Sequence, residues 1–293
     1  MRHGIATHVF LQQRLTPSLL DTLVRGGAAA IEVFAARHHF DYNDHGSVME
    51  LANWFRSNDV AASMHMPLFA DETHWTRHTA PTLNLISTNK GTRIASMDEV
   101  KRALEAAEQV AFNTCSLHLG LKDEQWDTRA LDDSLTAIEH LKAFAGPLGV
   151  KLLLENLSND VATPAHLIEI VKVGHFSTVG YAFDLGHAHM GQGVPATADL
   201  AAKSALELAF EAFAPAVDKI ASVHVHDNNS VRDEHLWPQQ DVEKGYIDWA
   251  QVKKLLRSLR PETILSLELA HELGDDAGQV VQDALEAWKL LDA

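Results

Sequence analysis

Short apolar runs alternate with longer amphipathic stretches along the whole chain. Leu131, Leu135, Ile138 and Leu141 show the helical spacing of one such stretch, because they recur every three or four residues. The short runs have the length and composition of buried strands, and they occupy residues 5–10, 29–34, 60–65, 114–119, 151–155, 178–183, 220–226 and 263–269. The pattern therefore predicts a repeat of strand and helix units.

Local signals predict where several of the intervening helices begin. Thr16 and Thr163 are each followed by a proline, which places a capping hydroxyl before a first-turn proline. Ser96 and Glu99 fit a capping box, so a helix is expected to begin near Ser96. Asp248 is expected to begin the helix that precedes the last strand.

The number and order of these units predict the fold. Repeated strand–helix units imply parallel pairing, because parallel strands need a crossover connection. Eight units in 293 residues match a single (β/α)8 (TIM) barrel. An open doubly wound sheet fits less well, because no glycine-rich nucleotide fingerprint follows the first strand. No linker or composition break divides residues 1–293, so one domain is expected.

Composition narrows the partners and the compartment. The chain has 24 basic and 40 acidic side chains, and its formal net charge of -16 weighs against non-specific attraction to nucleic acid or an anionic membrane. The single cysteine, Cys115, lies in an apolar run, where a buried structural thiol is expected. Signal-peptide features and apolar runs of the ~20 residues of a membrane span are absent, so a cytoplasmic location is expected. Assembly as a homo-oligomer stays open.

Histidines and carboxylates stand at or near the ends of the predicted strands. The set comprises His65, His118, Glu155, Asp184, His187, His224, His235 and Glu268. In a (β/α)8 barrel the C-terminal ends of the strands meet at one face, where the chemistry gathers. Imidazoles and carboxylates brought together are what a divalent metal ion needs. The sequence therefore predicts a metal site at that face.

Four of these residues come from strands five to eight and form the expected core of the site: Glu155, Asp184, His224 and Glu268. Three carboxylates and one imidazole make an oxygen-rich set that suits Mn²⁺, Mg²⁺ or Co²⁺ and also accommodates Zn²⁺. One such residue alone is weak evidence, because a strand-end glutamate or histidine is often a solvated or hydrogen-bonded structural group. Four on successive strands predict a bound ion.

A second set of residues surrounds this core and supplies additional candidate ligands: His65, His118, His187, Asp233 and His235. For each of them, hydrogen bonding to a core ligand or contact with a substrate is an open alternative. His226 joins the set, because His224 and His226 are two residues apart on a strand and point to the same side. The long loops at residues 67–96 and 227–245 are expected to build substrate contacts, and Arg232 is a candidate for one.

Five motifs carry a resemblance to a known family: LLLENL with Glu155, FDLGHAH with Asp184 and His187, HVHDN with His224, DEH with Asp233 and His235, and LELAHE with Glu268. Together with His65 they follow the order found in the xylose-isomerase-like barrel superfamily, which the chain resembles over essentially its whole length. This superfamily joins sugar isomerases and epimerases to the endonuclease IV family. The resemblance implies the barrel and a metal site, but the branches share that scaffold.

In the isomerase and epimerase branch, the resemblance implies one divalent ion held by Glu155, Asp184, His224 and Glu268. The ion would polarise a carbonyl of a sugar or sugar phosphate, and Glu155 and Glu268 would move a proton through an enediolate. The residues implied or considered as substrate contacts are His65, His118, His187, Arg232 and His235. A carbohydrate is then the expected partner.

In the endonuclease IV branch, the resemblance implies three zinc ions and cleavage of the DNA backbone at abasic sites. The additional ligands of that branch match His65, His118, His187, Asp233 and His235, and all five are present. A nuclease needs a positive track for phosphates, however, and both long loops mix basic with acidic residues. The nuclease is therefore the alternative reading, and a dehydratase or lyase of the same enediolate type is a further one.

Two departures refine the resemblance. The DEHLWP…GYIDW run is similar to a pattern of sugar-phosphate isomerases but departs from it at residues 238–245, where a glycine-rich turn is expected. Val161 stands six residues after Glu155, where the epimerases tend to carry a carboxylate. The first departure predicts an altered substrate loop. The second disfavours a fructose- or tagatose-type epimerase but not a related isomerase. A binding protein that kept only the fold would be expected to lack Glu155 or Glu268, and both are present.

Overall fold

The computed structural model describes residues 1–70, 79–191, 203–238, 244, 246–270 and 277–292. Within these residues the strands close into a barrel in which each strand pairs in parallel with its sequence neighbours and β1 pairs with β8. The strands are β1 (Arg2–Ala6), β2 (Ala30–Phe34), β3 (Ala61–His65), β4 (Phe112–Leu117), β5 (Lys151–Glu155), β6 (Gly180–Asp184), β7 (Ile220–Val225) and β8 (Ile264–Leu267). The predicted (β/α)8 barrel is confirmed.

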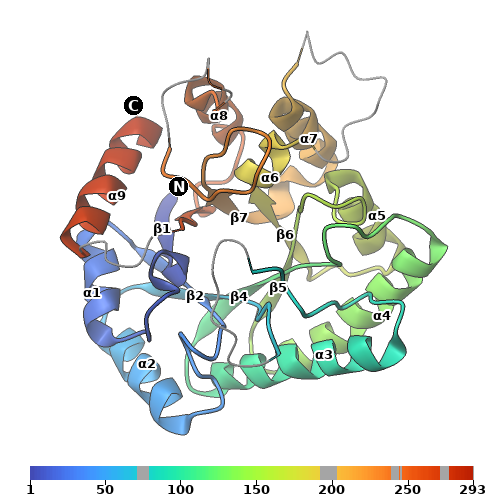
Figure 1. The fold of residues 1–293 in the computed structure, drawn as a ribbon, viewed down its shortest axis with the longest axis horizontal. Coiled ribbons are helices and arrows are strands. Elements are labelled where there is room, and N and C mark those ends of the chain that lie inside the picture. Colours follow the sequence, from blue (N-terminus) through green and yellow to red (C-terminus); the bar gives the residue numbers. More distant parts are fainter. Residues whose placement is uncertain (71–78, 192–202, 239–243, 245, 271–276, 293) are drawn as a thin grey trace.

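Helices surround the barrel as a ring (Figure 1). They are α1 (Pro17–Arg25), α2 (His45–Ser57), α3 (Lys90–Glu105), α4 (Thr128–Ala145), α5 (Pro164–Val173), α7 (Ala205–Phe213), α8 (Trp249–Leu256) and α9 (Ala277–Asp292). The short helix α6 (Leu185–His189) follows β6 directly, and 3-10 turns occupy η1 (Thr7–Phe10), η2 (Ala106–Glu108) and η3 (Ala214–Lys219). No helix in the described part of the chain combines the length and apolar composition that a membrane crossing requires.

Three of the predicted helix starts are confirmed by their caps. Thr16 accepts a hydrogen bond from the backbone N–H of Leu19, and Thr163 does the same for His166. Asp248 accepts from the N–H groups of Ala250 and Gln251 at the start of α8. Each cap satisfies a helix N–H that has no partner within the helix.

The first predicted strand, residues 5–10, is misplaced, because β1 begins three residues earlier, at Arg2. The strand ends at Ala6, and Thr7–Phe10 form the 3-10 turn η1. The reason is the hydroxyl of Thr7, which accepts a hydrogen bond from the N–H of Phe34 and lies 2.9 Å from Nε2 of His39. These side-chain bonds replace the strand ladder beyond Ala6, so His8 turns toward the end of the barrel.

The predicted start of a helix at Ser96 is wrong. Helix α3 begins at Lys90, and its cap is Asn89, which accepts from the N–H of Thr92. The hydroxyl of Ser96 instead accepts from the N–H of Asn84. Glu99, expected to complete the capping box, is buried and pairs with Arg37, Tyr42 and Arg102. The apparent motif is used for tertiary contacts, and the loop after β3 is shorter than predicted.

The positions of the strand ends decide what reaches the site. His65, Glu155 and Asp184 are the last residues of β3, β5 and β6, and His224 lies one residue before the end of β7. His118 and Glu268 are the first residues after β4 and β8. All strands are parallel, so these side chains come from the same end of the barrel. Residues 239–243 and 245, within the stretch that departs from the isomerase pattern, lie outside the described residues.

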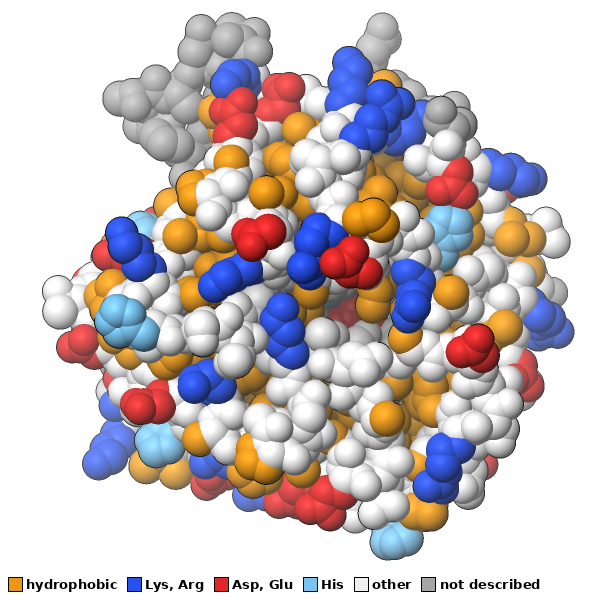
Figure 2. All heavy atoms as spheres, turned by 180° about the vertical axis from the view of Figure 1, so that it is seen from behind, with side chains coloured by type: hydrophobic (Ala, Val, Ile, Leu, Met, Phe, Trp, Pro, Cys, Tyr) orange, Lys and Arg blue, Asp and Glu red, His pale blue; other side chains and the backbone are white. Residues whose placement is uncertain are grey.

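Basic groups lie at the other end of the barrel. Lys151 is the first residue of β5, and Lys219 immediately precedes β7. Burial, together with the charges of Arg260 and Lys219, lowers the pKa of Lys151. Seen from behind, Lys and Arg side chains gather around the middle of the molecule (Figure 2). The excess of acidic residues is therefore not spread evenly over the surface.

Candidate metal centre

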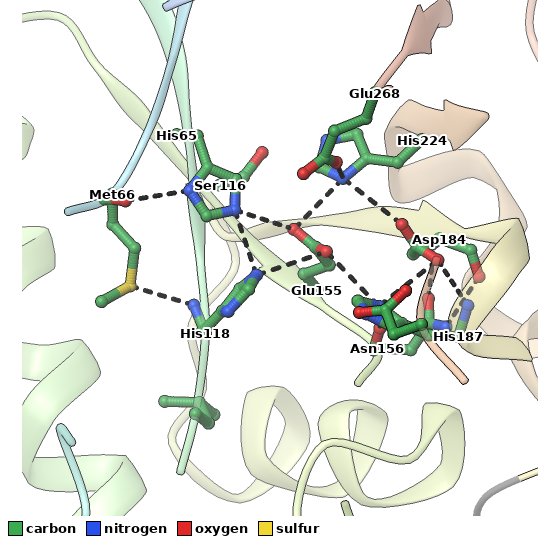
Figure 3. A network of polar contacts seen from close by, with 12 residues as sticks. His65, Met66, Ser116, His118, Glu155, Asn156, Asp184, His187, His224 and Glu268 are labelled. Atoms are coloured by element: carbon green, nitrogen blue, oxygen red, sulfur yellow. Dashed lines mark hydrogen bonds and ion pairs between the residues drawn. The ribbon is translucent and has the colours of Figure 1, made fainter. Parts of the chain in front are cut away.

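The four predicted core residues converge. One ligand atom from each of Glu155, Asp184, His224 and Glu268 lies within 4.8 Å of the others, and all four side chains are buried. Nδ1 of His224 is 2.8 Å from Oε2 of Glu268, 3.2 Å from Oε2 of Glu155 and 3.8 Å from Oδ2 of Asp184. Figure 3 shows the carboxylates around this ring nitrogen. Four successive strands thus supply one compact group.

Several atoms of this group are buried without an aligned hydrogen bond within the described residues. They are Oε2 of Glu155, Oε2 of Glu268 and both ring nitrogens of His224. Buried polar atoms without partners are costly, and an ion is one of the explanations that such atoms call for. Oxygen donors with one imidazole suit a hard or borderline divalent cation. The residues therefore fit Mn²⁺, Mg²⁺, Co²⁺ or Zn²⁺.

The electrostatics of the group favour a positive charge at its centre. Burial opposes the charged form of His224, but the carboxylates of Glu155, Glu32 and Glu268 outweigh it and raise the imidazole pKa well above its ordinary value. Burial likewise opposes the ionised carboxyls of Glu155 and Glu268, but nearby imidazoles together outweigh it and hold both pKa values well below the ordinary one. They are His224 with His118 for Glu155, and His224 with His235 for Glu268. The carboxylates that stabilise the extra proton on His224 would stabilise a bound cation in the same way.

A second group shares Glu155 with the first. His65, His118 and Glu155 bring one ligand atom each within 4.8 Å of the others. Nε2 of His65 lies 3.0 Å from Nε2 of His118, and that atom lies 3.3 Å from Oε1 of Glu155. Nδ1 of His65 is 2.9 Å from the carbonyl of Met66 and donates to it, so Nε2 is the nitrogen that faces the site.

A third group lies beyond Asp184 and consists of His187, His226, Asp233 and His235. Oδ2 of Asp233 is 3.1 Å from Nε2 of His187 and 3.4 Å from Nε2 of His235. The rings of His226 and His235 stack with their centroids 3.9 Å apart. Every additional candidate ligand predicted from the sequence therefore falls in the second or third group.

A buried aspartate anchors the loop that carries Asp233 and His235. Asp227, directly after His226, accepts hydrogen bonds from the backbone N–H groups of Asn228 and Ile247 and from the indole N–H of Trp249. A β-bridge between Asp227 and Leu236 closes the loop back on itself. Asp227 thus has a structural role, and the loop returns His235 to the barrel mouth.

A model of the xylose isomerase-like TIM barrel family matches residues 20–291 of the chain. The chain belongs to this family. An uncharacterized protein of Methanocaldococcus jannaschii is 27% identical over 279 residues, which are 92% of this chain and 83% of the relative. The resemblance inferred from the motifs is confirmed.

Solved structures share the fold. A D-tagatose 3-epimerase-like protein has a TM-score of 0.72 and 22% identity, with 100% of this chain and 98% of that chain covered. The IOLI protein with a bound zinc atom has a TM-score of 0.74 and 17% identity, with the same coverage of both chains. Structures of this fold thus include a zinc-bound one, and this xylose isomerase-like barrel has residue groups that could hold an ion.

Two buried residues near the site escaped the sequence analysis. Glu32, in the middle of β2, has Oε2 3.0 Å from Nε2 of His224. His8, in η1, forms a further close group with His235 and Glu268, and burial together with the nearby His235 lowers its pKa to about 3. The available signals were an acidic residue within the apolar run AAAIEVF and a polar one within residues 5–10.

Arg232 is the predicted site residue that the structure does not bring to the three groups. Its side chain is exposed and makes no hydrogen bond or ion pair within the described residues. Its role as a substrate contact stays a prediction. Val161, the residue at the position of the epimerase carboxylate, is fully buried.

Proposed function

We propose that this barrel is a divalent-metal-dependent isomerase or epimerase of a sugar or sugar phosphate. The observation that carries the proposal is the convergence of Glu155, Asp184, His224 and Glu268, several of whose ligand atoms are buried without an aligned hydrogen bond. Proteins of the same fold include one named as D-tagatose 3-epimerase-like, which supports a small carbohydrate as the substrate class. Membership of the xylose isomerase-like family supports the reaction class.

The bound ion would supply positive charge that polarises a carbonyl and an adjacent hydroxyl. Glu155 and Glu268 would do the proton transfer. Burial raises the pKa of both carboxyls, but the nearby imidazoles, His224 foremost, hold it well below the ordinary value, so both carboxyls are ionised. The ionised form is the one that can accept a proton. Each carboxylate has two oxygens, so one could bind the ion while the other accepts the proton.

The remaining polar groups would bind and orient the substrate in a site from which most water is excluded. His65, Glu155 and Glu268 are at most 4% exposed, so little water reaches them. A substrate bound at the mouth of the barrel would displace the remaining water and strengthen its electrostatic interactions with these side chains. His65, His118, His187 and His235 would donate to substrate hydroxyls. Each has one ring nitrogen that meets a carbonyl or a carboxylate, which leaves its orientation defined.

The test combines metal content with a reaction assay that does not require the product to be known. Protein purified without added metal is analysed for metal per chain, and about one equivalent is expected. Candidate ketoses and ketose phosphates are then incubated in D₂O, and NMR follows exchange of the C–H next to the carbonyl. Exchange in the wild type but not in Glu268→Gln would support the proposal; absence of exchange with every sugar would remove it.

One observation favours a second candidate function. The second and third groups place five more histidines (His65, His118, His187, His226 and His235) and Asp233 close enough together for two further ions, as the trinuclear abasic-site endonuclease would require. The distribution of basic residues disfavours a nuclease, because Lys151 and Lys219 lie at the opposite end of the barrel from the site and could not bind the phosphates of DNA there. About three equivalents of zinc per chain, with cleavage of abasic-site DNA, would establish the nuclease and overturn the isomerase.

A further inference from the structure

Glu32 is the carboxylate inside the barrel beneath the candidate metal centre. It is the third residue of β2, and it is 3% exposed. Oε1 accepts a 2.8 Å hydrogen bond from the hydroxyl of Ser116 on β4. Oε2 accepts a 3.3 Å hydrogen bond from the hydroxyl of Ser266 on β8 and lies 3.0 Å from Nε2 of His224. One buried side chain therefore links four strands.

The strand register explains how these groups meet. Ser266 pairs with His224 across β7 and β8, and Ser116 pairs with His65 across β3 and β4. Residues that pair across parallel strands lie at the same height in the barrel, so the two serines fix Glu32 just behind the ring of His224. Ser116 and Ser266 thus fix the orientation of the Glu32 carboxylate independently of its contact with His224.

The two nitrogens of His224 face different surroundings. Nδ1 faces the carboxylates of Glu155, Asp184 and Glu268, whereas Nε2 faces Glu32. A neutral imidazole carries its proton on one nitrogen, and the other nitrogen binds the metal. Without Glu32 the proton would be drawn to Nδ1, where Glu268 lies 2.8 Å away, and the nitrogen facing the carboxylates could not act as a ligand.

We propose that Glu32 is a positioning residue, which holds the Nε2–H of His224 and so presents Nδ1 to a divalent cation. This inference rests on the proposed metal-dependent function and assigns a role to a residue outside the ligand set. The Nε2–Oε2 pair is within donor–acceptor distance but not aligned as a hydrogen bond.

The consequence is measurable as metal affinity. A carboxylate behind a ligating histidine typically contributes about 10–100-fold to metal binding. Glu32→Leu removes the acceptor and should weaken Co²⁺ binding by that factor. Glu32→Gln keeps a carbonyl oxygen that can accept the Nε2–H, so it should restore the affinity to within about threefold.

A matched control separates positioning from the general loss of a buried glutamate. Glu99 is 1% exposed and ion-paired, but it lies on α3 outside the strand barrel, so Glu99→Leu makes the same chemical change away from His224. Glu99→Leu should lower the melting temperature and leave the Co²⁺ affinity unchanged. Equal loss of affinity in Glu99→Leu and Glu32→Leu would assign the effect to stability and overturn the proposal.

The experiment titrates metal-free wild type, Glu32→Leu, Glu32→Gln and Glu99→Leu with Co²⁺ by calorimetry. Wild-type affinity in Glu32→Leu, or a loss in Glu32→Gln as large as in Glu32→Leu, would overturn the proposal alone. A wild type that binds no Co²⁺ would overturn the proposed function, and this inference with it. Should Glu32→Leu not fold, ¹⁵N NMR of the Zn²⁺-loaded wild type decides: a proton on Nε2 of His224 is expected, and a proton on Nδ1 would refute it.

Discussion

Nε2 of His226 lies 3.1 Å from both carboxylate oxygens of Asp184. A carboxylate only accepts, so this nitrogen carries the hydrogen and the imidazole holds the carboxylate in place. The backbone N–H of His187 donates to Oδ1 of the same aspartate at 2.6 Å. Asp184 is thus oriented from two directions before any ligand arrives, which is the arrangement expected behind a metal-binding carboxylate.

Gly186→Ala should disturb this arrangement. A Cβ at position 186 would lie 2.0 Å from Cε1 of His226, and the ring is confined by its stacking on His235. The ring must shift, so a loss of about 1–3 kcal/mol in unfolding free energy is expected, with weaker metal binding. Denaturant unfolding and metal titration measure the two effects.

Gly91→Ala is the matched control for that prediction. Its Cβ would meet Oδ1 of Asn89 at 3.2 Å and nothing else within 4 Å. An alanine in this exposed first turn of α3 should be neutral or slightly stabilising. If Gly186→Ala behaves in the same way as Gly91→Ala, His226 does not position Asp184.

Glu268→Gln should lower turnover by about 10²- to 10⁴-fold while the fold is retained, because the variant lacks an ionised oxygen that accepts a proton. The side chain is nearly isosteric, so the circular dichroism spectrum and melting temperature should change little. Steady-state kinetics on the substrate found by the D₂O screen measure the effect. Activity near that of the wild type would exclude Glu268 from the proton transfer.

His235→Asn separates a one-ion from a three-ion site. Asparagine is chosen because the backbone at position 235 has a φ of 47°, which asparagine tolerates better than alanine. With one ion, KM should rise about tenfold while the metal content and kcat stay close to those of the wild type. If the variant instead loses its activity and also about one equivalent of metal per chain, His235 is an essential ligand.

Metal affinity should rise with pH. Although burial opposes it, the carboxylates of Glu155, Glu32 and Glu268 raise the pKa of His224 well above the ordinary value, so the metal-free imidazole is protonated at neutral pH. A cation that binds Nδ1 displaces a proton, and each proton released makes affinity about tenfold higher per pH unit below that pKa. Calorimetry in two buffers of different ionisation enthalpy counts the protons. An affinity that does not change between about pH 6 and about pH 8 would contradict this.

Acid should destabilise the metal-free protein partly through His39, which belongs to none of the candidate ligand groups. Burial lowers the pKa of His39 to about 4. The unfolded chain, with a pKa near 6.5, therefore binds a proton that the folded chain does not, and stability falls as pH decreases from about 6.5 to about 4. The loss from this residue is on the order of 3 kcal/mol.

His39→Asn removes that titration. The variant loses the contacts to Gln13 and Thr7, so it should be less stable than the wild type at neutral pH. Its unfolding free energy should fall less steeply in acid, so the difference from wild type should shrink as the pH drops. Chemical unfolding with a chelator present, repeated across this pH range, measures the difference. If the unfolding free energies of the two proteins fall in parallel, His39 binds its proton equally well in the folded and unfolded states, and the prediction is wrong.

The barrel and most of the candidate centre were predictable because the relevant information is local. A strand end followed by Glu155 or Asp184 can be read from a few residues, and the parallel topology brings such ends together. Glu32 could not be predicted in this way, since it stands in the middle of a strand where the pattern favours apolar residues. His8 was hidden because the apolar run continues through Phe10 while the hydroxyl of Thr7 ends the strand.

The separation of the side chains into three groups was also beyond the sequence. Spacing along the chain does not reveal that Glu155 lies between His118 and His224, because that contact depends on how the closed barrel sets each strand beside its neighbours. The capping box at Ser96 failed for a related reason. Its glutamate is used by Arg37 and Tyr42, which lie more than 50 residues away in sequence.

The pairing of β1 with β8 means that the centre cannot exist in a partly made chain. Glu268 follows the last strand to join the ring, and His224 precedes it by a whole strand–helix unit. A ribosome-bound fragment that ends before β8 would contain Glu155, Asp184 and His224 but not Glu268. Capture of an ion by all four would then be a late event in folding, because it requires β8 to have paired with β1 and β7.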